Sequence, residues 1–189
     1  MLAPPRYGLP PARETLHQHL MSFARGHAND DLLARMLASH ALGEGVLPAD
    51  FGLGEDRFEP MIGRHFPGLH WRTAGAAPPP ALPERDDLVR LLSLDAAGDP
   101  DEARDIAHIV AAACQGSDHL WHDLGLWSRA ELTRLMRTNF PALAARNSGD
   151  MKWKKFLYKQ LCLQEGIYIC RAPSCETCVD YALCFGAEE

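Results

Sequence analysis

Hydrophobic residues recur along most of the chain at the three- and four-residue spacing of amphipathic helices. No window shows sustained alternation of β-branched and polar residues, which would indicate a strand. We therefore predict an all-α fold. The segments with helical spacing are residues 12–26, 29–45, 87–95, 101–116 and 128–140.

Residues at the ends of these segments agree with helix termini. Asn29 precedes two acidic residues and predicts an N-cap, while Gly43 follows the apolar pattern as a C′ glycine would. Ser128 and Glu131 have the separation of a capping box. A stretch rich in proline and alanine, residues 73–87, is instead typical of a linker or extended surface loop.

The length and composition favour one globular unit. With 189 residues and 47% hydrophobic content, the chain is long enough to bury a sizeable core. We expect a single helical domain over residues 1–189. Its C-terminal part, residues 151–186, is treated below as a metal-binding segment.

A weak internal repeat runs through the helical segments. The sequence GEGVLPADFGL at residues 43–53 matches GSDHLWHDLGL at residues 116–126 at five positions without a gap. Each is followed by a helical pattern and then by a similar turn, HFPGL or NFPAL. This order predicts a helical duplication with copies at residues 28–69 and 101–143.

The two copies differ where the second has side chains that can bind metal. Cys114 and His119 align with Ala41 and Val46 of the first copy. If apolar residues suffice to form this turn, the cysteine and histidine were not needed for folding. We interpret Cys114 and His119 as a candidate accessory metal site. Core packing by the cysteine and a loop role for the histidine remain the alternative.

The charge of the chain excludes one class of partner. A formal net charge of −6 does not suit general nucleic-acid binding, because phosphate contacts require a basic face. The opening MLAPPRYGLPP lacks the apolar run of a signal peptide, and no stretch approaches the length of a membrane span. We therefore expect a cytoplasmic protein with no membrane contact. Cytoplasmic thiols stay reduced, so the six cysteines favour metal binding over disulfides.

Four cysteines lie within fifteen residues near the end of the chain, with the spacing C-x4-C-x2-C-x5-C. Thiolates this close together on one loop can converge on a zinc ion or an iron–sulfur cluster. Zinc sites usually pair two C-x2-C elements across a longer insert, and this chain has one, so the spacing favours an iron–sulfur cluster. A zinc site and unrelated thiols stay open. The four residues are Cys170, Cys175, Cys178 and Cys184.

The four lysines of the protein all lie just before this cluster, within residues 151–160. Three of them share one face of the predicted helix, which is either a solvated surface or a docking face for an acidic partner. The opposite face is apolar. The three lysines are Lys152, Lys155 and Lys159, and the apolar stripe is Trp153, Leu157 and Leu161.

The cysteine loop is similar to that of the endonuclease III and adenine glycosylase group, in which it also follows a helical domain. The first arm of the present loop is two residues shorter, however. The L-P-G-V-G hairpin by which those enzymes hold phosphate is absent from this sequence, and the chain is acidic. An iron–sulfur DNA-repair enzyme is therefore the more remote alternative.

A closer resemblance covers roughly residues 106–186. The segments HLWHDLGLWSRAELTRLMRTNFPALAARN and MKWKKFLYKQLCLQEGIYICRAPSCETCVDYALCFG closely resemble the NifQ family of nitrogen-fixation proteins. Members are molybdenum–iron–sulfur proteins that supply molybdenum for the nitrogenase iron–molybdenum cofactor. The resemblance implies a cluster of the 3Fe-4S or 4Fe-4S type held by the four cysteines, since they match the family motif.

The same resemblance implies partners and a role. The partners are the nitrogenase cofactor-assembly scaffold and nitrogenase reductase, and the cargo is molybdate or a molybdenum–sulfur species. Exposed sulfides of an iron–sulfur core are soft donors that suit molybdenum once its oxo groups are removed. The protein is then expected to act as a carrier, not as an enzyme. A zinc-stabilised helical interaction module is the alternative that the residues alone leave open.

Overall fold

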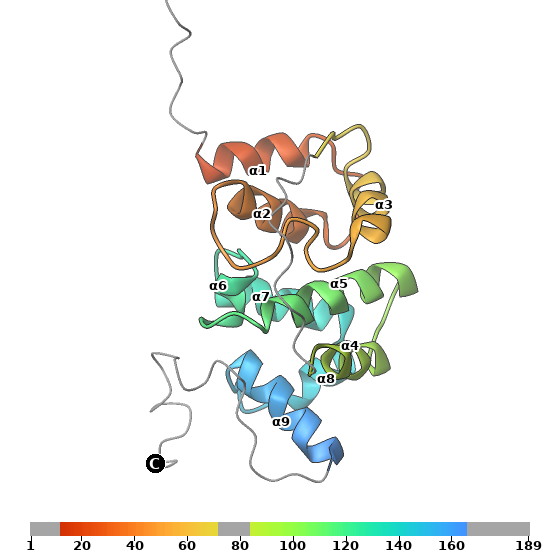
Figure 1. Cartoon of the computed structure of the whole chain (residues 1–189), viewed down its shortest axis with the longest axis vertical. Helices are drawn as coiled ribbons and strands as arrows, with labels where there is room; N and C mark the ends of the chain where they lie inside the picture. The colour runs from red at the N-terminus through yellow and green to blue at the C-terminus, as the bar shows by residue number, and fades with distance from the viewer. Residues whose placement is uncertain (1–11, 72–83, 166–189) are drawn as a thin grey trace, which may run out of the picture.

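The computed structural model describes residues 12–71 and 84–165, and all regular structure in these ranges is helical (Figure 1). The all-α prediction is therefore confirmed for this part of the chain. None of the helices described combines the length and apolar character needed to cross a bilayer. The helices are α1 (Arg13–Met21), α2 (Asp30–Ala41), α3 (Glu55–His65), α4 (Glu84–Leu94), α5 (Pro100–Ala113), α6 (Leu120–Asp123), α7 (Arg129–Asn139), α8 (Pro141–Arg146) and α9 (Trp153–Glu165).

The helices form three tiers along the long axis of the molecule. Figure 1 shows α1, α2 and α3 at one end, α5, α6 and α7 across the middle, and α4, α8 and α9 at the other end. The end tier holds α9 against α4. Because α9 leads directly to the cysteine-rich segment, this arrangement fixes where that segment leaves the helical body.

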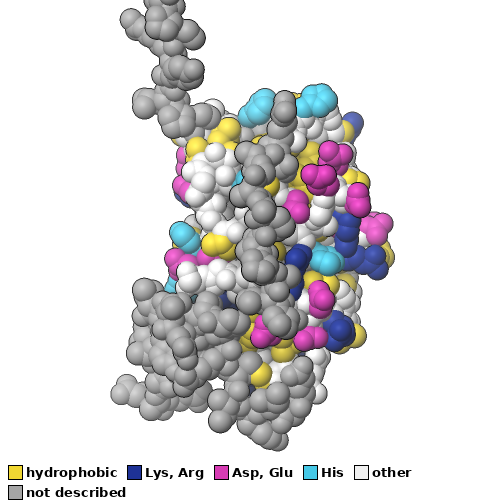
Figure 2. Space-filling model, viewed as in Figure 1, with side chains coloured by type: hydrophobic (Ala, Val, Ile, Leu, Met, Phe, Trp, Pro, Cys, Tyr) yellow, Lys and Arg dark blue, Asp and Glu magenta, His cyan; other side chains and the backbone are white. Residues whose placement is uncertain are grey.

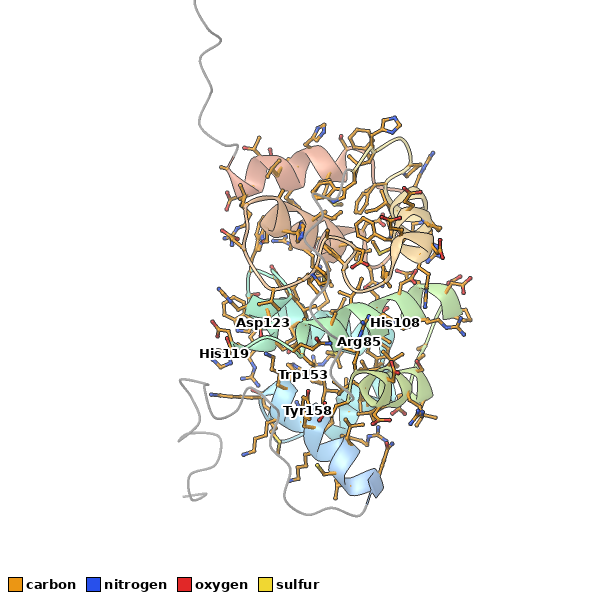
Figure 3. The ribbon with its side chains drawn as sticks, viewed as in Figure 1. Arg85, His108, His119, Asp123, Trp153 and Tyr158 are labelled. Atoms are coloured by element: carbon orange, nitrogen blue, oxygen red, sulfur yellow. The ribbon has the colours of Figure 1, made fainter. Side chains whose placement is uncertain are left out.

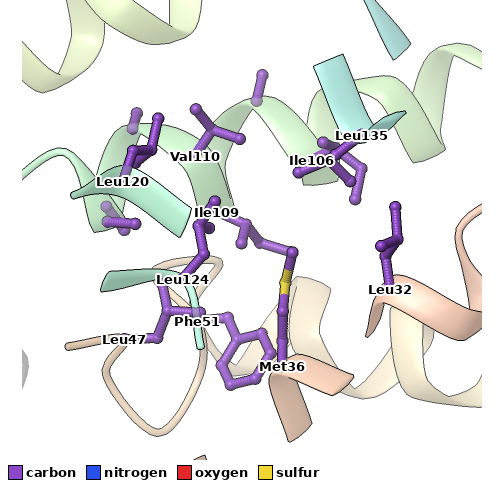
Figure 4. Packing of buried hydrophobic residues seen from close by; sticks show 14 of the residues in the cluster. Leu32, Met36, Leu47, Phe51, Ile106, Ile109, Val110, Leu120, Leu124 and Leu135 are labelled. Atoms are coloured by element: carbon purple, nitrogen blue, oxygen red, sulfur yellow. The ribbon is translucent and has the colours of Figure 1, made fainter. Parts of the chain in front are cut away.

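The middle helix α5 is the centre of the hydrophobic core. Its side chains are buried around most of its circumference, and its alanines allow neighbouring helices to approach closely. Figure 4 shows its apolar residues packed against α2 and α7, whose Leu32, Met36 and Leu135 are fully buried. The helix begins where Asp99 accepts hydrogen bonds from the N–H groups of Asp101 (3.0 Å) and Glu102 (2.9 Å).

The three predicted helix ends lie at the predicted residues. Ser128 and Glu131 form the capping box at the start of α7. Gly43 follows the end of α2 with a φ of +76°, in the left-handed region that favours glycine. Asn29 lies at the N-cap position of α2, but its side chain makes no capping hydrogen bond. That amide is used in a buried contact between helices instead.

This contact belongs to a network of buried polar side chains that joins four helices. Asn29 donates to Asn139 of α7 over 2.8 Å and to Glu102 of α5 over 2.6 Å, and Asn139 donates back to Asn29 over 2.9 Å. Beside it, the Nδ1 atom of His65 from α3 lies 2.6 Å from a carboxylate oxygen of Asp30. Buried polar groups are costly unless paired, so these pairs fix how the helices sit against one another.

The predicted linker at residues 73–87 is wrong at its C-terminal end. The structure does not describe residues 72–83, but α4 begins at Glu84. The acidic residues 84, 86 and 87 occupy its first turn, where negative charge is favourable to the helix dipole. The buried residues Leu88, Leu91 and Leu92 then hold the helix on the core.

The two predicted copies share local geometry at two points. Gly52 and Gly125 of the aligned loops have φ values of +77° and +71°. Phe66 and Phe140, at the ends of α3 and α7, have φ values of −133° and −135°. The duplication itself stays a prediction.

The buried amide pair generates a prediction about stability. Replacing Asn139 by leucine removes both hydrogen bonds that it shares with Asn29 and leaves the Asn29 side-chain oxygen without that donor, and we expect a loss of about 1–3 kcal/mol in the free energy of unfolding. The double variant N29L/N139L should cost less than the sum of the two single variants, because they share one interaction. Urea denaturation measures all three, with the exposed neighbour variant Thr138→Val as the control. An N139L protein as stable as the control would contradict a structural role for the pair.

Candidate functional site

The four predicted cluster ligands lie outside the described residues. Cys170, Cys175, Cys178 and Cys184 all follow α9, which ends at Glu165, and the loop predicted to wrap a metal cluster falls on the same undescribed segment. The structure does describe how α9 is attached to the rest of the protein. That attachment determines which residues lie close to the start of the cysteine segment.

The apolar face of α9 is buried as the sequence predicted. Trp153, Leu157 and Leu161 are at most 8% exposed. The indole N–H of Trp153 also donates to the hydroxyl of Thr133 on α7 over 3.3 Å. The helix is therefore held by an apolar face and by a polar contact at its first residue.

Lys154 makes a second and stronger attachment on the other side of that first turn. Its ammonium group donates to the carbonyl of Gly116 over 2.8 Å and forms a salt bridge with Asp123. The two side chains are 11% and 1% exposed, so this ion pair is almost fully removed from water. Figure 3 labels Asp123 and Trp153, the residue before Lys154, in this region between the middle tier and α9. Removing one partner of a buried ion pair strongly destabilises the fold, because the other charge stays buried without compensation.

Asp123 also organises the loop that contains the candidate accessory ligands. Its carboxylate accepts the backbone N–H of Asp118 over 3.2 Å, and its carbonyl accepts the N–H of Val46 over 2.9 Å. A Cβ atom at Gly116 would overlap the same carboxylate, so glycine is favoured there. One aspartate therefore joins α9, the loop at residues 116–123 and the first-copy loop around residue 46.

Cys114 lies at the end of α5, in the core beside this ion pair. It is 1% exposed, and burial raises the pKa of its thiol to about 12, although the ammonium of Lys154 acts in the opposite direction and Asp123 in the same one. At neutral pH the residue is therefore a protonated thiol. The thiolate is the form that binds metals, so the described structure matches the core-packing alternative for Cys114.

His119 lies at the N-cap position of α6 and is partly exposed. Its backbone N–H donates to the side chain of Asp118 over 2.6 Å. Within residues 12–71 and 84–165, no three histidine, cysteine or acidic residues are grouped so that they could hold a metal ion. The accessory site of Cys114 and His119 therefore stays a prediction.

A pocket opens on the other side of the same loop. It encloses about 770 Å³ between the loop at residues 46–54, the start of α4 and the outer face of α5. Its charged and polar side chains are Asp50, Arg85, Asp86, His108, Gln115 and Ser117. Figure 3 shows Arg85 and His108 close together on the side of the middle tier away from His119.

The sequence analysis missed the roles of Lys154, Arg85 and His108. Lys154 follows Trp153 directly, and helical spacing does not reveal that a neighbour of a buried residue turns inward to an ion pair. Asp123 did have a signal, because it aligns with Asp50 in the D-x-G-L motif of the predicted repeat. Arg85 falls in the range that was predicted to be linker, so it was not considered as part of a site.

Comparison with known proteins covers most of the chain. The sequence model of the NifQ family matches residues 32–186, which includes all four clustered cysteines. The match begins well before residue 106, so the family pattern also constrains much of the N-terminal third. No solved structure matches this chain.

Three relatives carry the same family name. Protein NifQ of Azotobacter vinelandii is 46% identical over 175 residues, covering 85% of this chain and 90% of the relative. A NifQ homolog of Sinorhizobium fredii is 36% identical over 161 residues, covering 84% and 70%. Protein NifQ of Rhodobacter capsulatus is 36% identical over 157 residues, covering 83% and 87%. The chain therefore belongs to the NifQ family of nitrogen-fixation proteins.

Proposed function

We propose that this protein holds an iron–sulfur cluster on Cys170, Cys175, Cys178 and Cys184, binds molybdenum there and donates it to assembly of the nitrogenase iron–molybdenum cofactor. The observation that supports this most directly is that the family match extends to residue 186 and so spans the whole C-x4-C-x2-C-x5-C motif. Membership in the family places the chain in nitrogen fixation and molybdenum processing. The cluster, its cargo and its delivery are the proposal.

The chemistry of the four thiolates fits this role. Thiolates are soft ligands that bind iron–sulfur clusters, and the sulfides of such a cluster are themselves donors for a thiophilic metal such as molybdenum. Molybdenum is then cargo held in a mixed-metal cluster and later released. Binding and release require no bond in a substrate to be broken, so the protein is proposed to be a carrier with the cofactor-assembly scaffold and nitrogenase reductase as its partners.

The attachment of α9 gives this carrier a defined geometry. Cys170 follows the end of α9 by five residues, and α9 is held by its buried apolar face, by Trp153 and by the Lys154–Asp123 ion pair. A ligand segment that begins from a fixed helix loses less conformational entropy when it closes around a cluster. We therefore expect the helical body to contribute to cluster retention.

Metal analysis of anaerobically prepared protein tests the proposed function. We expect iron, acid-labile sulfide and substoichiometric molybdenum, with visible absorption and a paramagnetic signal that a cluster of this type gives. Cys175→Ala should abolish iron retention, because it removes one thiolate ligand. Cys114→Ala is the matched control and should retain iron, since its thiol is buried and protonated. One equivalent of zinc in a colourless protein would instead support the zinc-stabilised interaction module.

A second test separates the role of α9 from that of the ligands. Lys154→Met leaves Asp123 buried without its counter-charge, and we expect unfolding to become easier by about 3 kcal/mol. Because the first turn of α9 loses an attachment, iron per chain after anaerobic desalting should also fall. Lys159→Met, an exposed lysine of the same helix, is the control and should change neither quantity. A K154M protein with wild-type stability and iron content would show that the ion pair is dispensable.

A further inference from the structure

The pocket at the outer face of α5 has hydrogen-bond donors on three of its walls. Arg85 comes from the first turn of α4, His108 from α5, and Gln115 and Ser117 from the segment that follows α5. The guanidinium of Arg85 gives one N–H to the carbonyl of Gly52, which orients it. An arginine has five N–H donors, and within the described residues this one hydrogen bond to Gly52 is the one that Arg85 makes.

The charges around His108 favour an anion. Burial lowers the pKa of its imidazole, and the guanidinium groups of Arg57 on α3, Arg85 on α4 and Arg104 on α5 lower it further, against the opposing charge of Asp105. Burial is the larger cause and does not by itself favour an anion, but the positive charge of the arginines that disfavours an added proton also attracts negative charge. Figure 2 shows basic, histidine and acidic side chains interspersed over the α5 region of this face.

Each acidic residue in or beside the pocket either has hydrogen-bond partners or faces solvent. Both carboxylate oxygens of Asp50 accept backbone N–H groups of their own loop, from Gly52 over 2.9 Å and Gly54 over 3.1 Å. Asp86 is exposed to solvent. Asp105 is occupied by Arg57 over 2.5 Å and by Arg64 over 3.3 Å. Arg104 has no ion pair with any residue of the described ranges, and the same holds for Arg85.

We propose that this pocket binds a small hydrated oxyanion through Arg85 and His108. Its volume of about 770 Å³ exceeds that of one tetrahedral oxyanion, so the ligand would keep part of its hydration shell. A bare metal cation is disfavoured by the arginines. A loop residue of the pocket, Gly116, is also the carbonyl partner of Lys154 at the first turn of α9.

This inference rests on the proposed function for the identity of its natural ligand. If the protein takes up molybdenum, the metal arrives as molybdate, a dianion whose four oxygens accept the donors described above. The pocket would hold the cargo in its oxygen-coordinated form, next to the loop that attaches the helix leading to the cysteines. It would therefore be a binding site distinct from the four cysteines.

The first experiment measures anion binding to the cluster-free full chain. Isothermal titration calorimetry measures the dissociation constant of molybdate, and of sulfate as a second probe. We expect this constant to be about tenfold or more higher in Arg85→Gln than in the wild-type protein, because a charge-assisted hydrogen bond is lost. Arg90→Gln is the matched control, since Arg90 is an exposed arginine of the same helix with the same charge. His108→Gln is a second variant in case the arginine change disturbs the fold. Equal affinity in all of these proteins would overturn the proposal.

The second experiment measures the titration of His108 with and without anion. If Arg85 and His108 had only a structural role, the anion would leave this titration unchanged. A bound anion stabilises the imidazolium, so sulfate should raise the pKa of His108, assigned by NMR through its absence in the H108Q protein. By the same linkage, sulfate should bind more tightly as the pH falls through the pKa of His108, which burial and the neighbouring arginines hold below its ordinary value. Binding should change little above neutral pH. An unchanged His108 titration in saturating sulfate would contradict the site.

The two proposals fail in different ways. An R85Q protein could still take up iron and molybdenum at wild-type levels and at the wild-type rate. That result would overturn the proposed role of the pocket and leave the carrier role standing. Conversely, the protein could bind an anion at Arg85 and yet never acquire iron. That result would support the pocket as an oxyanion site and overturn the carrier role.

Discussion

The positions of the central helices depend on buried polar side chains that must satisfy one another. Asn29 and Asn139 are 110 residues apart in sequence and exchange two hydrogen bonds in the core. An apolar contact tolerates a small shift between helices, whereas a buried amide that loses its partner loses the full value of its hydrogen bonds. The pair therefore selects one arrangement of α2 against α7 from the many that hydrophobic packing alone would permit.

The same network gives the predicted repeat a physical meaning. In the alignment of the two copies, Asn29 corresponds to Glu102 and His65 to Asn139. The structure brings Asn29 to Asn139, and it places the Nε2 atom of His65 3.9 Å from a carboxylate oxygen of Glu102. The start of each copy thus faces the end of the other. A duplicated helical hairpin that closed on itself as a symmetric pair would leave this pattern, with the residue types since diverged.

Sequence patterns predicted the helices well because amphipathic spacing and helix caps are local. The capping box of Ser128 and Glu131 and the C′ glycine Gly43 needed nothing beyond neighbouring residues. The role of Asn29 was missed because its partners lie at residues 102 and 139, and only the fold brings them together.

The candidate site divides along the same line. The four clustered cysteines were evident from spacing, and the burial of Trp153 and Leu157 followed from helical periodicity. Lys154 was only counted among the four lysines of residues 151–160, because its partner Asp123 lies 31 residues earlier on a different loop. Arg85 and His108 line the same pocket because α4 packs on α5. Long-range ion pairs and pockets depend on tertiary contacts that a pattern within one segment does not contain.

The burial of Cys114 determines when its thiol can react. A protonated thiol with no access to solvent reacts slowly with oxidants and electrophiles. It becomes reactive only when the core around α5 opens. The rate at which a thiol reagent labels Cys114 would therefore report how often the core around α5 opens.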